Sequence, residues 1–179
     1  EVYVDESLSS SLSNISTLNN SRYILIEFPM NNKCLNLEEV LYQLKKEKLI
    51  PIIAHPERYS YYYKDYLFFE KLIQQGCLLQ GNIGSLYGDY GKKSQKMIKA
   101  LLKRGMIQFI GSDIHHKSSD IYDRKIEKDL LKIIKNQAVV EDLLVNNTDK
   151  VINNILGVKV MNESEVLKLN QKVDIRGVV

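Results

Sequence analysis

Apolar residues in this chain gather into short runs that alternate with segments of helical spacing. Five runs rich in Ile, Val, Leu, Tyr or Phe predict β-strands. They cover residues 1–4, 23–28, 49–55, 78–83 and 107–113. The runs lack regular polar alternation, which is typical of parallel strands that are covered on both faces. The pattern therefore favours an α/β fold with a parallel sheet or barrel.

Helical segments lie between these strands, with apolar residues three and four positions apart. They contain Leu37, Val40, Leu41 and Leu44; then Tyr66, Phe69, Leu72 and Ile73; then Met97, Ile98, Leu101 and Leu102. Gly76 and Gly105 come just after the second and third segments, where a left-handed residue commonly ends a helix. Helical spacing returns from residue 121 to 157, whereas residues 158–179 have no clear period.

Composition allows one globular domain, because 179 residues with 44% hydrophobic content can bury a substantial core. No apolar run approaches the roughly 20 residues of a membrane span, and the start of the chain does not resemble a signal peptide. Cys34 and Cys77 lack C-x-x-C spacing, so we expect a reducing, cytoplasmic setting. A net charge of +3 with scattered lysines does not indicate nucleic-acid binding. Because the chain opens at Glu1 without methionine, we expect a fragment.

Residues with metal-binding side chains recur at the predicted strand ends, which follow one another at about the 30-residue spacing of βα units. In parallel α/β folds the carboxyl ends of the strands converge on the ligand site. Carboxylates and imidazoles at one face suit Mn, Fe or Zn. The residues at or near these ends are Glu1, Glu27, His55, Asn82, Asp113 and His115.

Each of these residues also has a purely structural interpretation. His55 alone could be a core histidine, and Asp113 with His115 could be a helix cap beside an exposed imidazole. Glu27 is harder to explain in this way, because a carboxylate after four apolar residues needs a cation. The shared position at strand ends favours a functional site.

Arg58 follows His55 by three residues and could bind a phosphate or carboxylate through two hydrogen bonds. The alternative is a surface ion pair with Glu57. For the tyrosines of residues 59–63, a half-buried packing face is favoured over an aromatic pocket. A cysteine phosphatase is excluded, because neither cysteine has an arginine six residues later, and residues 81–88 do not match a glycine-rich phosphate loop.

Four ordered motifs carry a resemblance to a known family: "SRYILIEFP", "PIIAHPERY", "GCLLQGNIGSLYG" and "FIGSDIHH". From residue 1 to about residue 157, the chain resembles the C-terminal two-thirds of the PHP (polymerase and histidinol phosphatase) family. The similarity is to its bacterial CpsB/YwqE-like group of capsule-regulating tyrosine phosphatases. Residues 158–179 form a tail outside the resemblance.

The resemblance implies a distorted (β/α)7 TIM-like barrel with a divalent metal cluster, with Mn expected and Fe, Zn or Mg as alternatives. It implies hydrolysis of phosphotyrosine on a kinase that regulates capsular or exopolysaccharide synthesis. Catalytic roles fall on Arg58 and Asp113, and substrate binding on Arg58 and Arg124. The implied metal ligands are Glu1, Glu27, His55, Asp113 and His115.

One departure from the family pattern concerns the first strands. The family begins with an H-x-H strand, and this sequence contains no H-x-H. We therefore expect that the N-terminal strands are missing and that the fragment is short of metal ligands and inactive. Two alternatives stay open: a related phosphoesterase acting on small phosphomonoesters, and a non-catalytic remnant that binds a partner or assembles with copies of itself. The general acid, the kinase and the oligomeric state also stay open.

Overall fold

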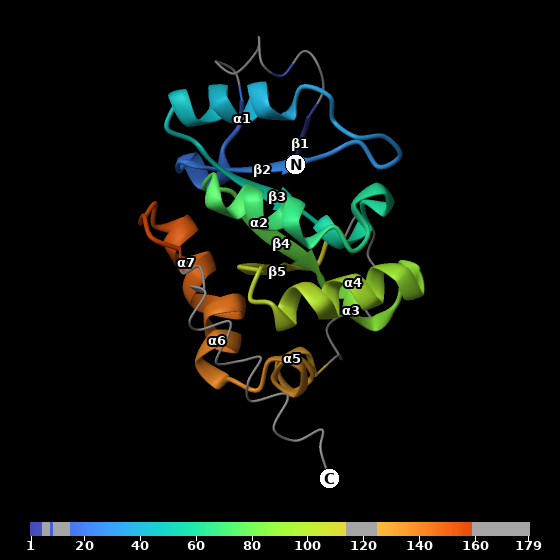
Figure 1. Ribbon diagram of the computed structural model, residues 1–179. Helices are drawn as coiled ribbons and strands as arrows, with labels where there is room; N and C mark the ends of the chain where they lie inside the picture. The colour runs from blue at the N-terminus through green and yellow to red at the C-terminus, as the bar shows by residue number, and fades with distance from the viewer. Residues whose placement is uncertain (5–7, 9–14, 114–124, 159–179) are drawn as a thin grey trace.

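A computed structural model of the chain describes residues 1–4, 8, 15–113 and 125–158. All five predicted strands are confirmed, and they form one parallel sheet in the order of the sequence (Figure 1). The strands are β1 (Val2–Tyr3), β2 (Tyr23–Glu27), β3 (Ile50–Ala54), β4 (Leu78–Asn82) and β5 (Phe109–Gly111).

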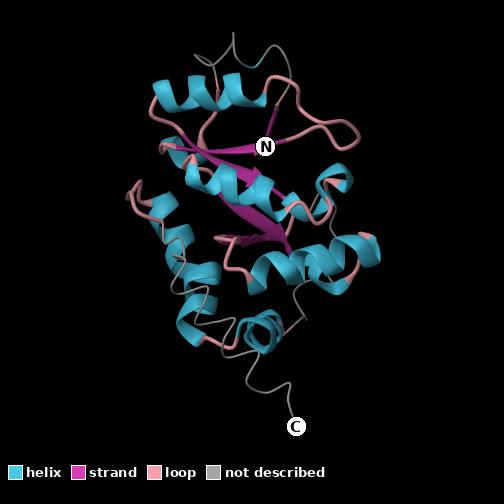
Figure 2. Cartoon of the chain, in the orientation of Figure 1, coloured by secondary structure: helices cyan, strands magenta, loops and turns pink. Residues whose placement is uncertain are grey.

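Helices connect the strands and continue beyond the sheet (Figure 2). The predicted helical segments correspond to α1 (Leu37–Lys46), α2 (Tyr66–Gln74), α4 (Gly91–Lys103), α5 (Ile126–Ile134), α6 (Gln137–Glu141) and α7 (Asn147–Ile152). A π-helical turn, η7 (Asp142–Asn146), joins α6 to α7, and α3 (Ile83–Tyr87) was not predicted. Short 3-10 helices are η3 (Leu18–Asn20), η4 (Pro56–Arg58) and η5 (Ser60–Tyr62).

The two faces of the sheet bury different clusters, because side chains alternate along each strand. Ile24, Ile53 and Leu79 join a large core that includes the apolar faces of α1, α2 and α4. Crossover connections between parallel strands share one handedness. Because these strands follow one another in sequence order, the helices in the connections lie on the same side of the sheet. Tyr23 and its neighbours Ile52, Leu78 and Phe109 form a smaller cluster, to which α7 adds Val151.

Closure of the sheet into a barrel is not established. In the described part of the chain, β1 and β5 are the edges of an open sheet. β1 pairs with the last residues of β2, through Val2 with Ile26 and Tyr3 with Glu27. The described strands therefore support the parallel α/β class.

The helices bear on two further points: the glycines expected at their ends and their length relative to a membrane span. Gly76 and Gly105 have φ of +98° and +66°, which confirms the left-handed residues expected after α2 and α4. No helix within the described ranges combines the length and apolar character that a membrane span requires.

Helix α2 offers a direct test of this packing, because it carries one buried and one exposed leucine. Leu72 is 2% exposed and Leu67 is 77% exposed. We expect Leu72→Ala to lower the free energy of unfolding by about 2–5 kcal/mol, because it leaves a cavity against the sheet. Leu67→Ala, the matched control, should change it by less than about 0.5 kcal/mol. Urea unfolding measures both, and equal effects would contradict the packing of α2.

Candidate functional site

Three of the predicted metal ligands meet at the carboxyl edge of the sheet. Ligand atoms of Glu1, Glu27 and His55 all lie within 4.8 Å of one another. His55 Nε2 is 3.4 Å from Glu27 Oε1 and 3.8 Å from Glu1 Oε2. Glu1 precedes its strand, yet it reaches this edge because β1 pairs only with the end of β2. The sequence prediction of these three residues as one cluster is consistent with the geometry.

The backbone of His55 sets the direction of the chain after β3. His55 has φ of +33°, in the left-handed region that few side chains adopt, and it directly precedes η4. Its carbonyl accepts a hydrogen bond from the Arg58 backbone N–H at 2.9 Å. The imidazole is 2% exposed and lies against the Tyr59 ring, with centroids 5.6 Å apart. The turn therefore fixes the imidazole beside the carboxylates and returns Arg58 to the same edge.

The chemistry of these three donors fits a divalent metal ion. Two carboxylates converge on one imidazole, and like charges at this spacing are stabilised by a cation between them. The oxygen and nitrogen donors suit Mn, Fe or Zn. Within the described residues, Glu1, Glu27 and His55 are the group that meets this geometry. They would supply part of the coordination of one ion.

Asp113 lies in a second group of polar side chains beside the first. Its Oδ2 accepts hydrogen bonds from Arg58 Nη1 and from Asn82 Nδ2, each at 2.8 Å. The Asp113 side chain is 4% exposed and that of Arg58 is 22% exposed. The structure therefore brings Asp113 together with Arg58, and places neither in the cluster of Glu1, Glu27 and His55. His115 and Arg124 lie outside the described residues.

Glu57 and Asn82 hold the second group, Asp113 and Arg58, in place through hydrogen bonds. The sequence pattern did not predict this structural role for either residue. Glu57 is 4% exposed, so its interpretation as a surface ion-pair partner of Arg58 is wrong. Its Oε1 accepts a hydrogen bond from the Asn82 backbone N–H at 3.0 Å. Burial raises the pKa of the Glu57 carboxyl to about 7, although this hydrogen bond lowers it. A glutamate directly after His-Pro and before Arg gave no sequence signal of burial.

The tyrosines after Arg58 confirm the prediction of a packing face. Tyr59 and Tyr62 are buried in the large core, and Tyr61 packs against it. The Tyr59 hydroxyl accepts a hydrogen bond from the Phe28 backbone N–H and donates one to the Ala54 carbonyl, each at 2.9 Å. Burial raises the pKa of Tyr59 above its ordinary value, so this hydroxyl keeps its proton. Tyr59 thus joins the ends of β2 and β3, which carry Glu27 and His55.

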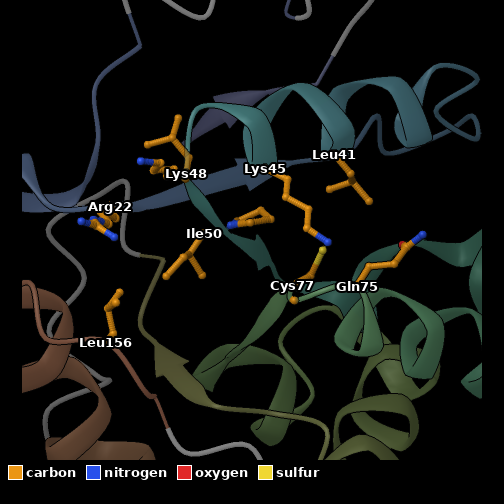
Figure 3. Close-up of a pocket in the computed structure, with 11 residues that line it drawn as sticks. Arg22, Leu41, Lys45, Lys48, Ile50, Gln75, Cys77 and Leu156 are labelled. Carbon is orange, nitrogen blue, oxygen red and sulfur yellow. The ribbon is translucent and has the colours of Figure 1, made fainter.

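A pocket of about 280 Å³ lies elsewhere, near the starts of β3 and β4 and the last turns of α1 and α2 (Figure 3). Its lining includes Arg22, Lys45, Lys48 and Leu156. In a parallel sheet the strand starts and strand ends lie at opposite edges. This pocket is therefore separate from the cluster at Glu27 and His55.

Comparisons with known proteins agree with this assembly. The family model for capsular polysaccharide synthesis proteins, CpsB/CapC, matches residues 1–153. The tyrosine-protein phosphatase YwqE of Bacillus subtilis is 35% identical over 100 residues, which are 56% of this chain and 39% of that protein. The putative tyrosine-protein phosphatase CapC of Staphylococcus aureus is 38% identical over 101 residues, 56% of this chain and 40% of CapC.

A solved structure extends the similarity to three dimensions. It comes from work on YwqE from Bacillus subtilis and CpsB from Streptococcus pneumoniae, described as metal-dependent tyrosine phosphatases. The TM-score is 0.76 at 26% identity, and the match covers 86% of this chain and 63% of the solved chain. The matched part of this chain corresponds to about 40% of the length of its curated relatives CapC and YwqE.

The Tyr59 hydroxyl provides a test of how the site is held. Tyr59→Phe should lower the free energy of unfolding by about 1–3 kcal/mol, because it leaves the buried Phe28 amide without its hydrogen bond. Tyr42→Phe is the matched control, since Tyr42 is 63% exposed on α1. Urea unfolding of both variants makes the comparison. A Tyr59→Phe value equal to that of Tyr42→Phe would argue against this role.

Metal binding tests the three-residue cluster itself. Titration calorimetry with Mn²⁺ and Zn²⁺ should show that Glu27→Gln and His55→Ala each weaken affinity at least about 10-fold. Even the loss of a residue that supports a metal ligand commonly costs that much. Glu70→Gln, an exposed change on α2, should leave affinity unchanged. If all variants bind the ions equally, the cluster is not the metal site.

Proposed function

This chain belongs to the CpsB/CapC family of capsular polysaccharide synthesis proteins, and we propose that its site takes part in metal-dependent hydrolysis of phosphotyrosine. The observation that carries the proposal is the placement of a metal-binding cluster and a guanidinium at the same edge of the sheet. The relatives named as tyrosine-protein phosphatases support the substrate class.

The two groups of side chains have complementary roles in this proposal. Glu1, Glu27 and His55 would hold the metal ion, with His115 as a further ligand. When bound, a divalent ion activates water at neutral pH and stabilises charge on the phosphoryl group. Arg58 binds the phosphoryl oxygens through two parallel N–H groups, and Arg124 contributes to substrate binding. Asp113 orients Arg58 and is the candidate for moving a proton or completing the metal shell.

We also propose a barrel type, a preferred metal ion, a substrate and a cellular setting for this chain. We place residues 1–157 in a distorted (β/α)7 barrel and residues 158–179 in a tail, with manganese as the preferred ion. The sequential parallel order of the strands supports the barrel, because barrels also place consecutive strands side by side. The substrate is a phosphorylated kinase of capsule or exopolysaccharide synthesis. A cytoplasmic setting is supported by Cys34 and Cys77, which form no disulfide.

Residues 1–179 alone are proposed to have low activity. The sequence holds three histidines and no H-x-H. The metal cluster that the family resemblance implies uses more imidazoles than these three can supply. A longer protein that carries the H-x-H strand would complete the cluster.

Arg58 provides the test of the proposed function. With Mn²⁺ and a phosphotyrosine peptide, Arg58→Ala should lower kcat/KM about 100- to 1,000-fold, the usual cost of losing a group that stabilises transition-state charge. Arg104→Ala is the control, since Arg104 stacks on Tyr66 of α2, apart from the site. Where turnover of residues 1–179 is too slow to measure, the affinity for phosphotyrosine in the presence of Mn²⁺ gives the same comparison.

Three outcomes would change the proposal. Full activity or affinity of Arg58→Ala would contradict the role of the guanidinium. Activity that survives removal of divalent ions by EDTA would contradict metal dependence. Faster hydrolysis of small phosphomonoesters than of the peptide would favour the related phosphoesterase.

A further inference from the structure

The guanidinium of Arg58 is held from two directions. In its own plane, Nη1 donates to Asp113 Oδ2 at 2.8 Å. The guanidinium also lies over the face of the Tyr90 ring, with 4.2 Å between the guanidinium carbon and the ring centroid. A hydrogen bond alone leaves the group free to rotate about that bond, whereas a stacked ring restricts the rotation. The combination leaves the outer N–H groups in a fixed plane.

The segment between β4 and α4 contains a short helix and two glycines that place Tyr90 beside Arg58. Helix α3 begins after Asn82, whose Oδ1 accepts a hydrogen bond from the Gly84 N–H at 2.8 Å. A Cβ on Gly84 would lie 2.8 Å from Tyr90 Cε2 and 3.2 Å from Asp89 Oδ2. Gly88 then turns the chain with φ of +94°. Gly84 therefore leaves the space that the Tyr90 ring needs beside the strand end.

Packing alone does not account for Tyr90. Tyr90 is 40% exposed, unlike the buried Tyr59 and Tyr62. Tyr90 directly precedes α4, yet its side chain makes no hydrogen bond that caps this helix. Its exposed position beside Arg58 is the place where a bound phosphoryl group would arrive. A role toward the guanidinium fits these facts better than a role in the core.

We propose that Tyr90 is a positioning residue, which holds the plane of the Arg58 guanidinium so that it binds a phosphoryl group through two N–H groups. This proposal rests on the proposed function, since it takes Arg58 as the phosphate-binding residue. Stacking requires the ring and not the hydroxyl. The effect should therefore be independent of what the phosphoryl group is attached to.

The test is the affinity of the 179-residue chain for phosphotyrosine and for phosphoserine, measured by titration calorimetry at one saturating Mn²⁺ concentration. Tyr90→Leu should weaken the affinity for both ligands by the same factor, roughly 2- to 30-fold. Tyr90→Phe should retain the affinity of the unmodified chain. Gly84→Ala, whose Cβ would crowd Tyr90 Cε2 at 2.8 Å and also lie 3.3 Å from Asn82 Oδ1, should weaken the affinity for both ligands.

Two controls separate positioning from a loss of structure. Arg104 stacks on Tyr66 at 3.8 Å, so Tyr66→Leu removes a matched pair away from the site and should leave both affinities unchanged. In the Arg58→Ala background, Tyr90→Leu should have no further effect. Thermal unfolding of each variant confirms that the chain stays folded.

The outcomes distinguish this inference from the proposed function. If Arg58→Ala weakens binding but Tyr90→Leu does not, the positioning role is wrong and the function stands. If Arg58→Ala leaves the affinity for both ligands unchanged, both the positioning role and the proposed function are wrong. A loss confined to phosphotyrosine would overturn positioning, because it would mean that Tyr90 contacts the substrate ring itself. If Tyr66→Leu weakened the affinity as much as Tyr90→Leu does, the positioning role would also be wrong.

Discussion

The hydrogen bonds of Asn82 are the constraint on which the carboxyl edge of this sheet depends. Its backbone N–H donates to Glu57 after β3, and its side-chain amide donates to Asp113 after β5. Its side-chain oxygen accepts from the Gly84 N–H at the start of α3. A parallel sheet brings strand ends to one edge, but it does not fix the loops that follow them. One buried asparagine fixes three of these loops together, because buried polar groups persist only when they are paired.

The fold of the site follows from strand order and register. Sequential parallel strands place consecutive βα units side by side, so polar residues about 30 positions apart become neighbours. The short pairing of β1 with the end of β2 extends this to Glu1, which a longer strand would have carried away from the edge. Left-handed backbone at His55 then turns the chain sharply where β3 ends. Local conformation and topology thus select which side chains meet.

The sequence allowed the prediction of strands, most helices and the cluster of Glu27 with His55, because these depend on apolar periodicity and on position at strand ends. It did not predict α3, since a helix of five residues that includes Gly84 carries too little periodicity. It also missed the burial of Glu57 and the bridging role of Asn82, which depend on contacts between residues about 25 to 31 positions apart in the chain. The role of Tyr90 was not predicted either, because its contact with Arg58 exists only in three dimensions.

The turn from His55 to Arg58 separates a negatively charged group of side chains from a positively charged guanidinium. His55, at the start of the turn, faces Glu1 and Glu27, where negative charge favours a cation. Arg58, at its end, faces Asp113 and Tyr90, which form an ion pair and a cation–π contact with its guanidinium. The Arg58 backbone N–H donates a hydrogen bond to the His55 carbonyl, which fixes the backbone of the turn that carries both side chains. The separation between a metal ion bound at one end and an anionic phosphoryl group bound at the other would therefore be set largely by this turn. Hydrolysis that needs an ion and a guanidinium at the same phosphorus requires such a fixed separation.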